Sequence, residues 1–206
     1  VDLDPEELRA ALRAYLDKGP DFIKFGGTAH FSRPSFIGFS PEAQRVMVDE
    51  AHRRDKVAET HATTADGLRL SVDAGIDLIQ HPELLGLREL PDSLVKAIVD
   101  KKVICSILSN TISGEAWTKA VKDRAEALAK RAEAEKAQKG LPRPRTGAEL
   151  RLRAAEEGLE LRMRRRNAQK LIAAGAVVTI GTDNYWAAAP EFTRGGTKPD
   201  SQNHGI

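Results

Sequence analysis

Residues 57–81 read VAETHATTADGLRLSVDAGIDLIQH. Two short, largely apolar runs at 57–61 and 76–81 flank a helical pattern at 65–74, which ends at Gly75. Short apolar runs of this kind, bounded by turn residues, are typical of buried strands. A strand, a helix and a second strand in succession predict two parallel strands with a helix packed on one face. This segment therefore predicts one repeat of an α/β fold.

The same pattern recurs on both sides of this segment. Asp4-Pro5 begins a helical pattern that stops at Gly19-Pro20, and a strand is predicted at 21–25. Ser40-Pro41-Glu42 begins the next helix, and a helix at 92–100 precedes a strand at 103–108. The last helical pattern ends at 173–175 and is followed by a strand within 177–183. No glycine fingerprint of the G-x-G-x-x-G or Walker type follows a strand, which favours a barrel over a nucleotide-binding sheet.

The strand count bears on how much of a barrel is present. A TIM-type (β/α)8 barrel has about 250 residues, whereas this chain has 206 residues and five predicted strands. We therefore expect an α/β fold that is the C-terminal part of such a barrel, with residues 1–206 forming one partial barrel domain. A helical insertion is predicted at about 115–167, broken at 141–145 and restarted at Thr146. Because the chain begins at Val1, a missing N-terminal barrel segment is also expected.

The composition excludes several classes of partner. The chain has 32 Lys+Arg against 30 Asp+Glu, so no overall charge favours nucleic acid or a membrane surface. The basic run at 162–166 follows Glu156, Glu157 and Glu160, which favours ion pairs on a solvated helix. No apolar run approaches the about 18 residues of a membrane span. The single cysteine, Cys105, rules out a disulfide framework and suits a cytoplasmic location.

Four chemically active side chains come from four of the predicted strands, namely Lys24, His61, His81 and Asp183. The carboxyl ends of parallel barrel strands open into one mouth, where catalytic groups gather. Each residue alone has an ordinary structural explanation, but two histidines, a lysine and an aspartate at one mouth indicate a metal site.

The remaining histidines and aromatic residues carry weaker indications. His30, in the loop after the first strand, and Tyr185 and Trp186, just after Asp183, are candidates for substrate binding. His52 is expected to face solvent, and Cys105 is expected to fill the core.

Several of these segments together resemble the metal-dependent amidohydrolase superfamily. They are residues 21–24, 40–54, 60–62, 74–81 and 180–183. The resemblance is nearest to the branch of imidazolonepropionases and Xaa-Pro dipeptidases. Residues 183–191 are similar to bacterial hydrolases of phenylurea and thiocarbamate herbicides.

The resemblance implies a hydrolase of C–N bonds in small molecules, such as amides, ureas or carbamates. Lys24 matches a lysine that becomes carboxylated and bridges two metals in binuclear members. His61 and His81 match metal ligands, and Asp183 matches a ligand that also handles the proton of the attacking water. One or two divalent ions are implied, with zinc favoured over cobalt, iron and manganese. A bound metal lowers the pKa of water and polarises the carbonyl.

The sequence also departs from the family pattern. The His-x-His pair of the first barrel strand is absent, so the chain is expected to need the missing segment for a full site. Alternatives are an Xaa-Pro dipeptidase-like peptidase, a Schiff-base lyase that uses Lys24, and a non-catalytic scaffold that binds partners through its helical insertion. Unpaired edges at the first and last strands favour a homo-oligomer.

Overall fold

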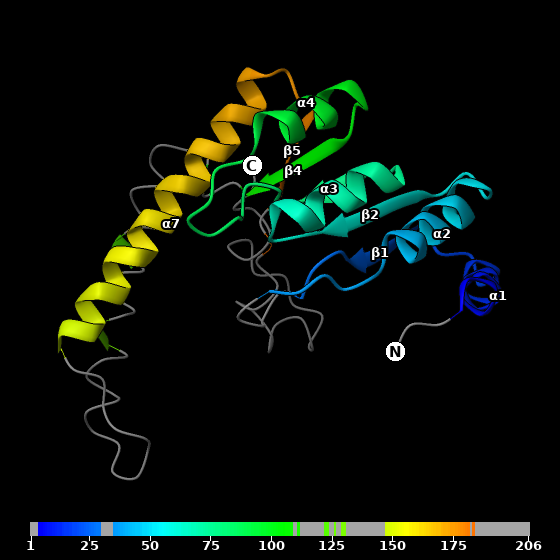
Figure 1. Cartoon of the computed structure of the whole chain (residues 1–206), viewed down its shortest axis with the longest axis horizontal. Helices are drawn as coiled ribbons and strands as arrows, with labels where there is room; N and C mark the ends of the chain where they lie inside the picture. The colour runs from blue at the N-terminus through cyan, green and yellow to red at the C-terminus, as the bar shows by residue number, and fades with distance from the viewer. Residues whose placement is uncertain are drawn as a thin grey trace, which may run out of the picture.

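The computed structural model describes residues 4–29, 35–108, 111, 122–123, 126, 129–130, 147–181 and 183. Its centre is a five-stranded sheet in which all neighbouring strands are parallel (Figure 1). The strands are β1 (Phe22–Gly26), β2 (Val57–His61), β3 (Leu78–Gln80), β4 (Ile104–Leu108) and β5 (Val178–Gly181). They lie side by side in chain order. The predicted α/β fold with a parallel sheet is confirmed.

The described helices alternate with the strands, and their ends follow the local sequence. They are α1 (Pro5–Leu16), α2 (Pro41–His52), α3 (Ala65–Ala74), α4 (Asp92–Asp100) and α7 (Gly147–Ala173). Asp4, Ser40 and Thr64 cap three N-termini by accepting hydrogen bonds from backbone N–H groups. Gly75 ends α3 with a φ of +92°, a conformation that glycine adopts without steric cost.

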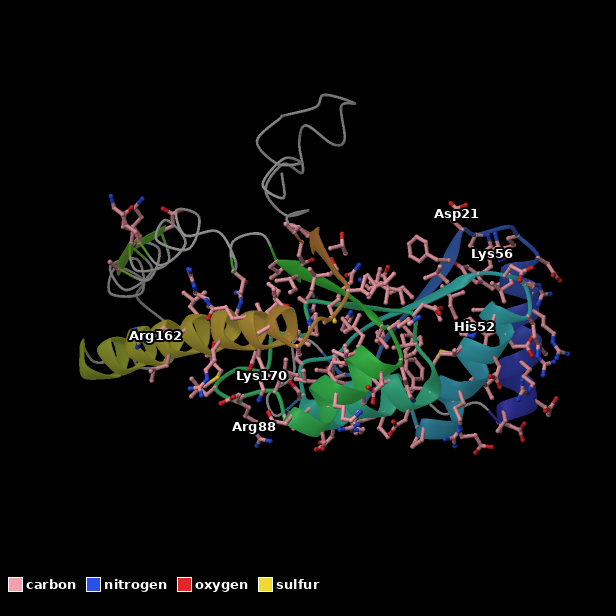
Figure 2. The ribbon with its side chains drawn as sticks, turned by 90° about the horizontal axis from the view of Figure 1, so that it is seen from above. Asp21, His52, Lys56, Arg88, Arg162 and Lys170 are labelled. Atoms are coloured by element: carbon pink, nitrogen blue, oxygen red, sulfur yellow. The ribbon has the colours of Figure 1, made fainter. Side chains whose placement is uncertain are left out.

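Helices α2, α3 and α4 cover one face of the sheet (Figures 1 and 2). The strand residues that point toward them form the core with side chains such as Leu68, Val72, Leu94 and Ile98. Those strand residues are Ile23, Phe25, Ala58, Ile79, Cys105 and Ile107. On the opposite face no described helix is packed, and Phe22 and Val57 stay about half exposed. In a closed barrel this second face would be the interior.

Helix α7 differs from the expected insertion in one respect. It runs without a break from Gly147 to Ala173, so the expected insertion boundary near residue 167 falls inside a single helix. Its C-terminal half belongs to the body of the fold, because Leu161, Ala168 and Leu171 are buried. The predicted break at 141–145 and restart at Thr146 lie outside the described residues.

The basic run on α7 also makes contacts beyond its own helix. Arg166 pairs with Glu89 at 3.2 Å, and Arg164 donates to the Thr111 hydroxyl at 2.7 Å. These partners attach α7 to the rest of the fold. None of the helices in the described ranges carries an apolar run long enough to cross a bilayer.

A buried carboxylate joins α1 to α2. Glu50 is 1% exposed and accepts hydrogen bonds from Arg13 at 3.0 Å and from Arg9 at 3.1 Å. The hydrogen bond from Arg13 outweighs the effect of burial and holds the pKa of Glu50 below its usual value. The contribution of Glu50 to stability is therefore present at neutral pH.

Glu50→Gln is expected to lower the free energy of unfolding by about 2 kcal/mol at pH 7, because it removes a charge-assisted pair. Since the folded-state pKa is the lower one, the difference should shrink as the pH falls below about 4.3. Urea unfolding at several pH values measures this. Asp49→Asn, at an exposed neighbour on α2, is the control with little effect. A Glu50→Gln difference that is the same at neutral and acid pH would contradict the assignment.

Candidate functional site

A cavity of about 370 Å³ opens near the carboxyl ends of the strands. Its wall consists of Lys24, Gln80, His81, Ser106, Leu108, Gly181 and Asp183. Three of the four residues predicted as metal ligands, Lys24, His81 and Asp183, thus share one cavity although they come from three different βα units. The fourth, His61, packs against His81.

Lys24 reaches this cavity from the middle of its strand rather than from the end. It is the third residue of β1, and its register partner on β2 is Glu59. Both side chains therefore lie on the face away from the helices. The Lys24 amine lies 3.4 Å from a Glu59 oxygen and donates a hydrogen bond to the side-chain oxygen of Gln80. The expectation of a strand-end position is thus wrong for Lys24, whose long side chain supplies the reach.

The two predicted histidine ligands lie ring against ring. The imidazoles of His61 and His81 are stacked, with centroids 6.0 Å apart and planes inclined by 23°. Gly26 lies beside His61 in the sheet, and a Cβ at that position would come within 3.2 Å of the His61 Nε2. A glycine there therefore leaves room for the imidazole of His61.

His81 follows β3 directly and has an unusual backbone conformation. Its φ is +40°, which is costly for a residue with a side chain, by roughly 1–3 kcal/mol. Its side chain is 2% exposed, and its amide donates to the carbonyl of Ser106 at 2.7 Å. Strained residues of this kind persist only where the surroundings hold them, and they are often found at functional sites.

Asp183 lies two residues beyond β5, also with a positive φ of 47°, and is exposed. Gly181, the last residue of β5, makes room for the hydroxyl of Ser106 on the neighbouring strand β4, because a Cβ at position 181 would lie only 2.9 Å from that oxygen. The cavity thus combines an exposed carboxylate, a serine hydroxyl and a buried imidazole.

The remaining residues singled out from the sequence fall into two groups. His30, Tyr185 and Trp186 fall outside the described residues. The Nε2 of His52 lies 2.8 Å from an Asp77 oxygen, near the start of β2 (Figure 2), and the side chain is 44% exposed, as expected for a solvent-facing residue. Cys105 is buried as predicted, and burial raises the pKa of its thiol to about 12, which makes it a poor nucleophile.

Gln80, Ser106 and Glu59 were missed by the sequence reasoning. Each is a polar residue within a largely apolar strand, and its side chain lies on the sheet face away from the helices, alternating with residues of the core. Such a polar residue is the signal in the sequence that could have identified it.

The donor types fit a divalent metal, but the described set is incomplete on its own. Imidazole and carboxylate are ordinary ligands for zinc and related ions. Among the residues that the structure describes, no three His, Cys, Asp or Glu side chains converge closely enough to hold an ion. Lys24, or donors outside the described residues, would have to complete the ligand set.

Known structures share the fold of this chain. The structure of molinate hydrolase superposes with a TM-score of 0.63 at 22% identity, covering 96% of this chain and 37% of that one. Phenylurea hydrolase B gives 0.58 at 24% identity, covering 88% and 35%, and an Xaa-Pro dipeptidase gives 0.55 at 20%, covering 89% and 39%. The chain therefore has the fold of these hydrolases, which a structure described as an amidohydrolase also shares. The resemblance predicted from the sequence is confirmed.

A curated sequence relative agrees with this amidohydrolase fold. Ochratoxinase from Aspergillus niger is 31% identical over 80 residues, which are 37% of this chain and 17% of the ochratoxinase. No protein-family profile matches the chain. The chain thus spans well under half the length of the amidohydrolase-fold structures it matches.

Proposed function

We propose that the chain is part of a metal-dependent hydrolase that cleaves a C–N bond of a small molecule, of the amide, urea or carbamate type, with phenylureas among the candidates. The observation that carries the proposal is the cavity shared by Lys24, His81 and Asp183, with His61 stacked on His81. A core or surface role explains each residue alone but not their common location. The amidohydrolase fold and the hydrolase names of its structural neighbours support the same reaction class.

Each residue has a distinct part in the proposed reaction. His61, His81, Asp183 and carboxylated Lys24 would hold one or two divalent ions, zinc being the favoured one. When bound, such an ion would supply an activated water and would polarise the scissile carbonyl. Asp183, which is exposed at the cavity wall, accepts the proton of the attacking water and passes it to the leaving nitrogen. Gln80 and Ser106 offer hydrogen bonds to the substrate, and Leu108 provides apolar contact.

Carboxylation of Lys24 requires a neutral amine. The ammonium first loses one proton to solvent; the Nζ lone pair of the neutral amine then forms an N–C bond to carbon dioxide, and a second N–H proton is released, so that a cation becomes an anionic oxygen donor. In the structure the amine contacts Glu59 and Gln80. These contacts hold the amine beside the cavity.

The metal content of the purified chain tests the proposal. After incubation with Zn²⁺ and bicarbonate, elemental analysis is expected to find zinc that chelation removes, and a panel of amide, phenylurea, carbamate and Xaa-Pro dipeptide substrates then identifies the bond cleaved. We also propose that donors from an N-terminal barrel segment complete the site. Full zinc occupancy in the isolated chain would contradict the proposal that a further segment is needed. The absence of bound zinc, both in the isolated chain and with such a segment added, would contradict the proposed metal-dependent hydrolase.

The position of the Lys24 amine at the cavity wall also suits a Schiff-base lyase, the second candidate function. Borohydride would then trap substrate on Lys24, and chelators would leave activity unchanged. The metal-dependent hydrolase predicts the opposite result in both assays.

A further inference from the structure

A buried acidic residue lies next to the cavity without lining it. Glu83 is in the loop between β3 and α4, two residues after His81, and its side chain is fully buried. A buried carboxylate is costly unless polar groups surround it. Its partners therefore indicate what it does.

The first group of partners belongs to the end of β4 and the residues after it. One oxygen of Glu83 accepts a hydrogen bond from the Leu108 amide at 2.9 Å and another from the Thr111 hydroxyl at 3.4 Å. Leu108 lines the cavity. Glu83 thus ties the loop that carries His81 to the next wall of the cavity.

The second group belongs to α7. Arg164 donates to the Thr111 hydroxyl at 2.7 Å, so its guanidinium reaches the Glu83 cluster through that hydroxyl. The side-chain amide of Asn167 donates to the backbone carbonyl of Glu83 at 3.3 Å and to that of Arg88 at 3.0 Å. Three segments therefore meet at Glu83, namely the loop after β3, the end of β4 with Thr111, and α7.

His81 needs such support because its backbone is strained. Its φ is +40°, and its own backbone groups bond to Ser106 on one side and to Leu84 on the other. We propose that Glu83 is a positioning residue for His81, which fastens the loop of residues 81–85 to β4 and α7 and so fixes the imidazole at the cavity. Only the assignment of His81 to metal binding rests on the proposed function.

Imidazole NMR of the metal-free chain, labelled with ¹⁵N-histidine, tests this proposal. His81→Gln identifies the His81 signals. Glu83→Ala is expected to shift or broaden those signals and to leave the His52 signals unchanged. Glu83→Gln, which keeps a carbonyl oxygen for the Leu108 amide, is expected to restore most of the wild-type pattern.

Two controls separate positioning from general stability. Glu89→Ala removes an exposed carboxylate of the same loop, which pairs with Lys170 of α7 at 3.0 Å, and should leave His81 unchanged. Leu68→Ala removes a buried side chain of α3 and so destabilises the core, and it should also leave the His81 signals unchanged. Unchanged His81 signals in Glu83→Ala, or an equal change in Leu68→Ala, would overturn the proposal. If Glu83→Ala does not fold, Thr111→Val replaces it, because this change removes the hydroxyl that links Arg164 to Glu83. The His81 signals of Thr111→Val are then expected to shift or broaden, and unchanged signals would overturn the proposal.

Metal binding gives a second readout. The Co²⁺ affinity of Glu83→Ala is expected to fall by about 10- to 100-fold, the usual effect of removing a group that orients a metal ligand. An unchanged Co²⁺ affinity would count against the positioning role. A wild-type chain that binds no Co²⁺, either by itself or with an N-terminal barrel segment added, would contradict the proposed function but not the positioning role, because the NMR comparison needs no metal.

Discussion

His81→Gln is expected to lower the affinity of the chain for Co²⁺ by about 100-fold or more, beyond the usual effect of changing a supporting residue. The physical reason is the loss of a buried imidazole that lies at the cavity wall and stacks on His61. Glutamine keeps much of the volume and the polarity but lacks the imidazole nitrogens. Titration followed by the visible absorption of bound Co²⁺ gives the affinity directly.

His52→Gln is the matched control for this experiment. His52 pairs with Asp77 near the start of β2 and does not line the cavity. Its replacement should leave Co²⁺ affinity within about twofold, a change worth less than 1 kcal/mol. Equal losses in the two variants would show that the metal binds elsewhere.

Asp183→Asn is expected to reduce kcat by about 10²- to 10⁴-fold, the range for a group that transfers a proton in the transition state. Asparagine has nearly the same shape but cannot take up the proton of the attacking water. KM for the best substrate of the panel should change little, because the amide still occupies the cavity wall. Steady-state kinetics at saturating Zn²⁺ measures both quantities.

Asp92→Asn provides a comparison for this variant. Asp92 is an exposed carboxylate on α4 that pairs with Lys170 at 2.6 Å, away from the cavity. It should keep full activity. An Asp183→Asn variant with wild-type kcat would assign the proton transfer to another residue.

The strand and helix order was predictable because apolar runs and capping residues are local signals. The pattern at 65–74 predicted α3 with the observed bounds, and each of the five predicted strands overlaps an observed one. The convergence of His81 and Asp183 on one cavity was predictable from topology, since parallel strands open at one edge, whereas Lys24 reaches it from the middle of β1 through its long side chain.

Features that depend on distant contacts were not predictable in this way. Glu83 lies two residues after His81 in a loop, yet it is buried, because Asn167, 84 residues further along the chain, donates to its backbone carbonyl and Arg164 reaches the same cluster through the Thr111 hydroxyl. The positive φ of His81 has no signal in the sequence. The contact between Lys24 and Gln80 follows from the strand register, which a single sequence does not specify.

Anomalous scattering from crystals of the chain grown with Zn²⁺ and bicarbonate tests the central claim most directly. The account predicts a peak in the cavity of Lys24, His81 and Asp183, with a histidine nitrogen at about 2.0–2.1 Å from the ion. A zinc peak only at surface residues away from this cavity, with His61 and His81 uncoordinated, would contradict it.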